Sequence, residues 1–467
     1  MRPGATPASL LFYAARPAPL FAAARRDISD AGTSPERSDL MNTVAALTAL
    51  NFFMADVRDG LGPYLAIFLQ GRSWSPIDIG LVLTIGGLAG MLATTPLGAF
   101  VDSTRRKRLV TIGAGLAVTL ACLAILFYPS FLLVSASQVL SGIAGAAIPP
   151  AIAAMTLGIV GPAEFSHQVG RNEAANHGGN VASAMACAAA SYVVGVEAVF
   201  FVMTIMAVAS IAATLAIRES AIDHAVARGL ETGEADDGKS GYAVLLKTPA
   251  LLAFGVILML FHFGNAAMLP LVGQRIEALG LGNAVLWTSI AVVVAQAVMV
   301  PIALISARIA ERYGYAPLLF AALVALPVRG IVAASTPEAW IAIPVQALDG
   351  VGAGILGVVT PALVARILRG TGRFNVGLGA VMTAQGVGAA LSMTAAGVMV
   401  ERGRDWLAAV GVETGLTGYG VAFLGLGAAA TVALALFVAA MRIMPLARES
   451  GHVAAKGGGA APTPAPA

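Results

Sequence analysis

The chain has 467 residues, of which 58% are hydrophobic and 11% charged, and its mean hydropathy is +0.83. A soluble protein carries roughly 25% charged residues, so a large water-soluble catalytic domain is excluded. A membrane-spanning helix needs about 20 apolar residues, and this composition supplies enough for roughly a dozen. The formal net charge of +3 does not indicate a nucleic-acid partner, because in a membrane chain the positions of the cations matter more than their sum.

Apolar windows recur along the chain in two groups of six. The first group covers residues 41–69, 77–101, 109–127, 131–158, 168–193 and 195–217. The second covers residues 249–273, 284–307, 315–334, 337–365, 375–400 and 417–441. We therefore predict an all-α integral membrane protein with twelve transmembrane helices in two six-helix bundles, 41–217 and 249–443, joined by a polar cytoplasmic linker, 218–248.

The two ends of the chain differ from the apolar windows in composition. Residues 1–26 contain Arg2, Arg16, Arg25 and Arg26 and no acidic residue, a pattern typical of an organelle transit peptide. The alternative is that residues 1–40 are a disordered or misassigned leader and that Met41 is the true start. Residues 444–467 end in Gly, Ala and Pro, which predicts a disordered tail.

The cations indicate how the chain crosses the membrane. Most of the 28 lysines and arginines fall on the tails and connections that share one side with both termini, among them the run Arg105 to Arg108. The opposite side is expected to carry Arg72, Arg275, Arg329, Arg402 and Arg404. The positive-inside rule then predicts a multi-pass protein of the plasma (inner) membrane with both termini in the cytoplasm.

The two halves repeat one another. Pro63 and Pro270, the stretches beginning at Gln138 and Gln346, and the acidic residues Asp102 and Glu311 are each separated by about 208 residues. Three nearly equal offsets indicate duplicated, pseudo-symmetric bundles. In transporters this architecture places the substrate site near the membrane midplane, between the repeats.

The loop between the second and third windows carries a further motif, Gly98, Asp102 and the basic run starting at Arg105, Arg106 and Lys107. With twelve spans in two halves, this motif resembles the Major Facilitator Superfamily over residues 41–443. The resemblance implies that the loop is a gating element in which Asp102 contacts a helix of the other half. The motif departs from the family pattern at Ser103 and Arg105. The alternative to a gating role is that the cations Arg105 to Arg108 only set the membrane topology.

Charged residues inside an apolar window are costly and need a partner or a watery cavity. The first window contains Asp56, Arg58 and Asp59. Asp56 and Asp59 are three residues apart and share a helix face, and two such carboxylates away from water favour sharing a proton. We expect a proton-coupling site here; the alternative is a structural salt-bridge cluster.

The fifth window begins with a polar stripe in which Glu173, His177 and Asn180 lie on one face, flanked by Asn172 and Asn176. Arg58 is expected to reach Glu173, since the resemblance makes the first and fifth spans neighbours. His177 is a second candidate for proton coupling, because histidine titrates near neutral pH. A structural, hydrogen-bonded histidine is the alternative.

The resemblance also implies that spans one, four, seven and ten line a central substrate cavity. Its expected wall adds further polar residues to those of spans one and five, namely Gln138, His262, Asn265, Gln346 and Asp349. Asp349 could instead lie at the outer end of the cavity or pair within the second half. Gln138 replaces an arginine that many family members carry, and span five lacks the Gly-Pro pair of drug/proton antiporters.

These patterns favour a secondary active transporter that moves a small solute by alternating access, coupled to protons or another ion. Uptake of a solute and efflux of a drug or toxic compound both remain open. Two rival classes are a non-transporting membrane sensor on the same fold and a membrane enzyme, although the sequence contains no recognisable catalytic motif. The expected partners are a small molecule, an ion and the lipid bilayer, with no cofactor, metal or nucleic acid, and the expected state is a monomer.

Overall fold

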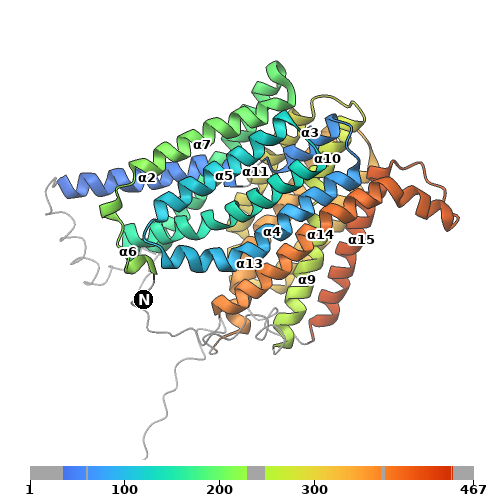
Figure 1. The fold of residues 1–467 in the computed structure, drawn as a ribbon. Helices are drawn as coiled ribbons and strands as arrows, with labels where there is room; N and C mark the ends of the chain where they lie inside the picture. The colour runs from blue at the N-terminus through green and yellow to red at the C-terminus, as the bar shows by residue number, and fades with distance from the viewer. Residues whose placement is uncertain (1–34, 59–60, 229–247, 370–373, 443, 445–467) are drawn as a thin grey trace, which may run out of the picture.

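The computed structural model describes residues 35–58, 61–228, 248–369, 374–442 and 444. Over these ranges the regular structure is helical, as predicted (Figure 1). The first half contains α2 (Pro35–Arg58), α3 (Pro63–Gly71), α4 (Pro76–Ser103), α5 (Lys107–Phe127), α6 (Phe131–Val194) and α7 (Ala198–Ala216). The second half contains α9 (Pro249–Asn265), α10 (Met268–Ala278), α11 (Ala284–Tyr313), α12 (Ala316–Ser335), α13 (Ala342–Ile367), α14 (Phe374–Ala409) and α15 (Gly418–Ala440).

The described residues form 11 runs that are long and apolar enough to cross a membrane. One run, His167–Ala216, holds both the fifth and the sixth predicted span, so the twelve predicted spans are all accommodated. Within α6, spans four and five are separated at Gly161, whose φ of 72° lies in the left-handed region and which Pro162 follows. Glycine tolerates this conformation because it has no Cβ. The chain therefore turns here without a long loop.

Spans one and seven are broken, which the apolar windows did not predict. The first window is divided between α2, which ends at Arg58, and α3, which begins at Pro63. The seventh is divided between α9, which ends at Asn265, and α10, which begins at Met268. Gly62 has a φ of 48° and Pro63 occupies the first turn of α3, a pair that stops one helix and starts the next. Irregular backbone within a membrane requires protein or water to satisfy it.

The helices that face outward differ from those at the centre in their exposed side chains. Large exposed apolar residues are frequent on α5, α7, α12 and α15, for example Leu120, Phe201, Ile331 and Val432. On α13, Ile343 is the only large apolar side chain among those exposed, and α9 contributes none. Helices α5, α7, α12 and α15 therefore suit contact with lipid. This distribution agrees with central positions for α9 and α13.

The two halves are joined at one end of the bundle, which we call the contact end. Helix α4 packs against α14, α6 against α11 and α3 against α10, and Figure 1 shows α4 and α14 side by side. The Tyr64 hydroxyl lies 2.9 Å from the Ser289 hydroxyl, and the Thr84 hydroxyl donates to the Ala390 carbonyl at 2.6 Å. The second of these bonds joins the first half of α4 to the middle of α14.

The opposite end, where α4 ends and α5 begins, is more open, and we call it the open end. A Cβ added at Gly98, Gly357 or Gly379 would meet nothing within 4 Å. By contrast, a Cβ added at Gly80, near the contact end, would lie 2.4 Å from the Met393 carbonyl oxygen. Among the residues placed in the structure, the hydrogen bonds that join the halves cluster at the contact end.

Candidate functional site

A cavity of about 100 Å³ lies inside the first half, between α2 and both parts of α6. Its polar wall comes from predicted residues and their neighbours: Asn51, Arg58, Thr156, Asn172, Glu173 and Asn176. Pockets that hold drug-sized ligands measure roughly 300–1,000 Å³, so this one suits water molecules or a small ion. The structure therefore brings Arg58, Glu173 and Asn176 to one cavity, whose other walls are apolar.

Hydrogen bonds fix the helices around this cavity. The Gln168 side-chain amide donates to Asn172 Oδ1 at 2.9 Å and to the Thr48 hydroxyl at 3.3 Å. Asn172 Nδ2 donates to the Thr156 hydroxyl at 3.0 Å. Gln168 and Thr48 are not among the predicted site residues. Gln168 could have been found, because it lies four residues before Asn172 and extends the polar stripe by one turn.

The charged residues of span one lie in different surroundings. Asp56 is half-buried, and the Ser183 hydroxyl donates to its Oδ1 at 2.5 Å. Asp59 lies outside the described residues, so its predicted pairing with Asp56 stays a prediction. Glu173 is exposed and lines the same cavity as Arg58. A direct Arg58–Glu173 ion pair likewise stays a prediction.

His177 and Asn180 continue the polar stripe beyond the cavity wall, and both are half-buried. Within the described part of the chain, Nδ1 of His177 is buried and has no hydrogen-bond partner. An unpaired buried polar atom is costly. The alternative of a fully hydrogen-bonded structural histidine therefore does not describe Nδ1 in this conformation.

The structure corrects the position of Arg329. The charge pattern places it among the cations outside the membrane, yet it lies in the middle of α12 with 1% of its surface exposed. Its guanidinium donates to Asn265 Oδ1 at 2.5 Å, to Asp349 Oδ1 at 2.8 Å and to Gln346 Oε1. The signal was present, because Arg329 falls inside the predicted span 315–334. Of the two alternatives for Asp349, pairing within the second half is the one observed.

Arg275 is also expected on the opposite side, and the structure buries it at the end of α10. Its Nη1 donates to the carbonyl oxygens of Ala333 and Thr336 at 2.6 and 3.2 Å. The guanidinium therefore caps the C-terminal end of α12, where the helix dipole is negative. A cation in this position carries no information about the side of the membrane.

The remaining expected cavity residues belong to separate surroundings. His262 is half-buried one turn before the break in span seven, and its Nδ1 lies 2.9 Å from the Leu258 carbonyl oxygen. Gln138 packs against Gly86 of α4, within the first half. The structure thus brings Asn265, Gln346 and Asp349 together around Arg329. His262 lies one turn before Asn265 on α9, and Gln138 remains within the first half.

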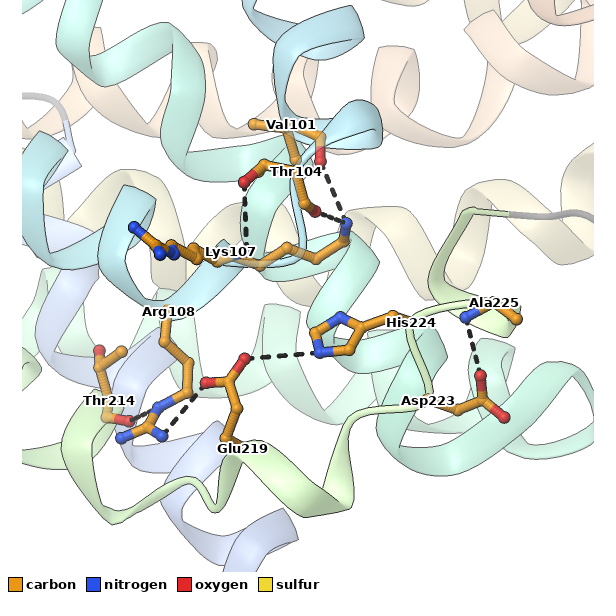
Figure 2. Close-up of polar contacts among 10 residues, drawn as sticks. Val101, Thr104, Lys107, Arg108, Thr214, Glu219, Asp223, His224 and Ala225 are labelled. Carbon is orange, nitrogen blue, oxygen red and sulfur yellow. Dashed lines mark hydrogen bonds and ion pairs between the residues drawn. The ribbon is translucent and has the colours of Figure 1, made fainter.

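The loop expected to act as a gate is built around Lys107 (Figure 2). Lys107 is fully buried, and its Nζ donates to the carbonyl oxygens of Val101 and Thr104 at 3.0 and 2.8 Å. Arg105 and Arg106 are exposed, and so is Asp102, which has no hydrogen-bond or ion-pair partner within the described residues. The predicted contact of Asp102 with the other half is not seen among the described residues and stays a prediction. Lys107 instead holds the end of α4 to the start of α5.

The beginning of the linker packs beside this loop. Arg108 donates to the carbonyl oxygens of Thr214 and Leu215 at 3.2 and 3.0 Å and pairs with Glu219 at 3.3 Å. Glu219 also approaches Nε2 of His224 at 3.5 Å (Figure 2). Residues 218–228 thus lie against the first half at its open end.

Asp223 shapes the docked part of the linker. Its backbone N–H donates to the Gly158 carbonyl oxygen at 2.9 Å. The backbone amides of Val226 and Ala225 donate to its carboxylate and hold the pKa of Asp223 below its ordinary value. The linker turn is therefore attached to α6 by backbone contacts and stabilised by an ionised carboxylate.

Comparison with known proteins places this architecture in a family. The sequence profile of the Major Facilitator Superfamily matches residues 43–393, and the chain belongs to that family. It is similar to an uncharacterized MFS-type transporter of Mycobacterium tuberculosis (strain CDC 1551 / Oshkosh), with 41% identity over 85% of this chain and 92% of the relative. The predicted family and its all-α membrane fold are thereby confirmed.

Solved transporter structures share the fold at low sequence identity. A mutant form of the nucleoside transporter NupG superposes with a TM-score of 0.69 at 15% identity, covering 85% of this chain and 99% of that one. A bacterial homologue of the human lysosomal transporter Spinster, inward-facing and unoccupied, superposes with a TM-score of 0.61 at 14% identity, covering 90% of this chain and 100% of that one. At this identity the likeness concerns the fold. The chain is a multi-pass membrane protein of a transporter family.

Proposed function

We propose that the protein is a secondary active transporter that moves a small solute by alternating access and couples this movement to protons. The observation that carries the proposal is the asymmetry between the two ends of the bundle. Hydrogen bonds join the halves at the contact end, whereas a Cβ added at Gly98, Gly357 or Gly379 near the open end would meet no atom within 4 Å. Breaks in both repeat-related spans place polar residues partway between the two ends, as in transporters with discontinuous helices.

The orientation of this conformation follows from the distribution of charge. With both termini in the cytoplasm, the open end, which carries Arg105 to Arg108, faces the cytoplasm. Arg275 and Arg329 are buried inside the protein and no longer count as cations on the outer side, which strengthens this assignment. The conformation is then inward-facing, and the contact end is the closed outer gate.

Proton coupling is assigned to the first half. Asp56 and His177 are titratable and half-buried. Arg58 and Glu173, two and four residues away from them along the chain, line one cavity. A carboxylate that lies within hydrocarbon depth and contacts water can bind and release a proton as the accessible side changes. Arg329 forms an ion pair with the half-buried carboxylate of Asp349 in the second half, so that carboxylate is less suited to this task.

Alternating access can be tested without a known solute. In the double variant Thr84→Cys/Thr394→Cys, oxidation should form a disulfide that joins the halves at the contact end. The hydroxyls of the two threonines lie 2.7 Å apart there. A Gly357→Cys reporter should then react faster with a membrane-impermeant maleimide applied from the cytoplasmic face. The matched control is Ser141→Cys opposite the native Cys122, 3.9 Å away within one half. Equal labelling rates for both disulfides would contradict alternating access.

Proton coupling is tested by reconstituting the protein into vesicles that contain a pH-sensitive dye. Solutes for this assay come from a thermal-shift screen of the purified protein against a solute library. Asp56→Asn, Asp59→Asn and His177→Gln should slow solute-driven proton movement, with Tyr192→Phe as a control at an exposed polar residue of the same helix as His177. If all three variants exchange protons at the parent rate, the residues are structural and the coupling assignment is wrong.

A further inference from the structure

The cluster around Arg329 unites three helices of the second half. Arg329 comes from α12, Asn265 is the last residue of α9, and Gln346 and Asp349 lie one turn apart on α13. Nearby, the backbone N–H of Ala267 donates to the Ser392 hydroxyl of α14 at 3.1 Å. Arg329 therefore ties the break in span seven to α13, while α14 holds the next residues of the break.

Three polar groups of this cluster retain hydrogen-bonding capacity. Asp349 uses Oδ1 toward Arg329, which leaves Oδ2 as an acceptor. Asn265 uses its carbonyl oxygen, which leaves its amide as a donor. Nδ1 of His262 must donate to the Leu258 carbonyl, so Nε2 of the neutral ring is an acceptor. His262 lies three residues before Asn265, so the two side chains lie on one face of α9.

The position of Asp349 relates this cluster to the open end. Its side chain is 21% exposed, whereas that of Arg329 is 1% exposed. Asp349, Ala353 and Gly357 lie at successive steps of four residues and share one face of α13. Ala353 and Gly357 are exposed and small, and a Cβ at Gly357 would meet no atom within 4 Å. Such a face suits an aqueous passage, because helices that face lipid in this protein expose large apolar side chains.

The repeat shows that the fold does not require this charge pair. About 208 residues earlier, Cys122 and Ser141 occupy the places of Arg329 and Asp349, with Sγ and Oγ 3.9 Å apart. The first half therefore builds the same helix pair with a thiol and a hydroxyl. Buried ion pairs are often no more stabilising than well-packed neutral residues, so a role other than stability is indicated for Arg329 and Asp349.

Resting on the proposed function, we propose that Arg329 is a positioning residue that holds Asp349 and Asn265, beside His262 on α9, as a binding surface for a neutral, hydroxyl-bearing solute. With His262 neutral, Arg329 and Asp349 cancel each other's charge, so the cluster gives a charged solute no net attraction to offset its desolvation. Hydroxyl groups can donate to Asp349 Oδ2 and His262 Nε2 and accept from the Asn265 amide. The second half thus binds the solute, while the first half binds protons.

The test measures binding to purified full-length protein by thermal shift with four probes. Inositol and ribose are neutral and hydroxyl-rich, choline is a cation and succinate is an anion. We expect a neutral probe to stabilise the parent and the Cys122→Ala control, and choline and succinate to have no effect. Asp349→Asn and Arg329→Leu should weaken that binding about tenfold or more, as expected for a lost hydrogen bond to a charged group. Arg329→Lys should recover part of it.

The double variant Arg329→Leu/Asp349→Asn distinguishes a loss of binding from a folding defect, because it leaves no uncompensated charge in the protein interior. If this double variant folds and binds a neutral probe as well as the parent does, the positioning role is wrong. Stabilisation by choline or succinate alone, or by no probe, overturns the assignment of solute class. Failure of the proposed function is a different result, since the Thr84–Thr394 disulfide would then leave labelling at position 357 unchanged.

Discussion

The contact between α4 and α14 at Gly80 predicts how a single methyl group changes the conformational equilibrium. An alanine Cβ at Gly80 would lie 2.4 Å from the Met393 carbonyl oxygen and 2.9 Å from the carbonyl carbon, both backbone atoms, whereas ordinary contact begins at 3.4 Å. The helices must therefore separate by about 1 Å, and overpacking of this kind costs about 1–3 kcal/mol. The cost falls only on the conformation with a closed contact end.

The expected size of the effect follows from that cost. The higher helix propensity of alanine, about 1 kcal/mol, acts in both conformations and cancels from their equilibrium. A difference of about 1–3 kcal/mol shifts the ratio of the two conformations by a factor of about 5 to 150 toward opening at the contact end. The matched control is Gly379→Ala on α14, where an added Cβ meets nothing within 4 Å.

The assay is the distance between spin labels at Val193, in the last turn of α6, and Glu413, which follows α14, in a background without the two native cysteines. Both positions are exposed, and they belong to different halves. Gly80→Ala should add or enlarge a population with a longer distance, and Gly379→Ala should match the parent. If the two variants give the same distance distribution, the contact at Gly80 does not control closure, and the reasoning from its geometry is refuted.

Three further outcomes are expected. Arg275→Leu should lower the melting temperature in detergent by several degrees, because it removes charge-assisted hydrogen bonds of about 1.5–3 kcal/mol each from the end of α12; an unchanged melting temperature would contradict this. Lys107→Met should increase proteolysis of the loop after α4, whereas Arg106→Gln at the exposed neighbour should not. Because the pKa of Asp223 is lowered by folding, its contribution is complete above its unfolded pKa of about 3.9 and is lost as the pH falls through the folded pKa. Hydrogen exchange in residues 223–228 should accordingly be faster in Asp223→Asn at neutral pH, and unchanged exchange would refute the role of the carboxylate.

The two halves share a fold and differ in the chemistry placed at their repeat-related positions. In the first half, Arg58 is the last residue of α2. The repeat-related position in the second half is Asn265, the last residue of α9, and the buried cation of that half is Arg329 on α12. The two halves therefore have the same helix arrangement but carry different polar groups at related positions. It gives a physical basis for dividing proton coupling and solute binding between them.

The sequence by itself determined the membrane class, the number of spans, the duplication and the family. These properties depend on the length and repetition of apolar stretches, and burial in a bilayer constrains those directly. It also identified the polar stripe from Asn172 to Asn180, since helical periodicity assigns residues of one helix to a common face.

Only the tertiary structure decided which polar groups meet. Arg329 lies in a predicted span, yet its partners Asn265 and Asp349 come from helices 64 and 20 residues away along the chain. Lys107 belonged to a run of four cations, and packing alone buries it while Arg105 and Arg106 remain exposed. The apolar windows also gave no sign of the turn at Gly62 or of the end of α9 at Asn265, which break spans one and seven. Hydropathy measures how well each segment dissolves in lipid, whereas the pairing of a charge depends on the angle and depth at which separate helices cross.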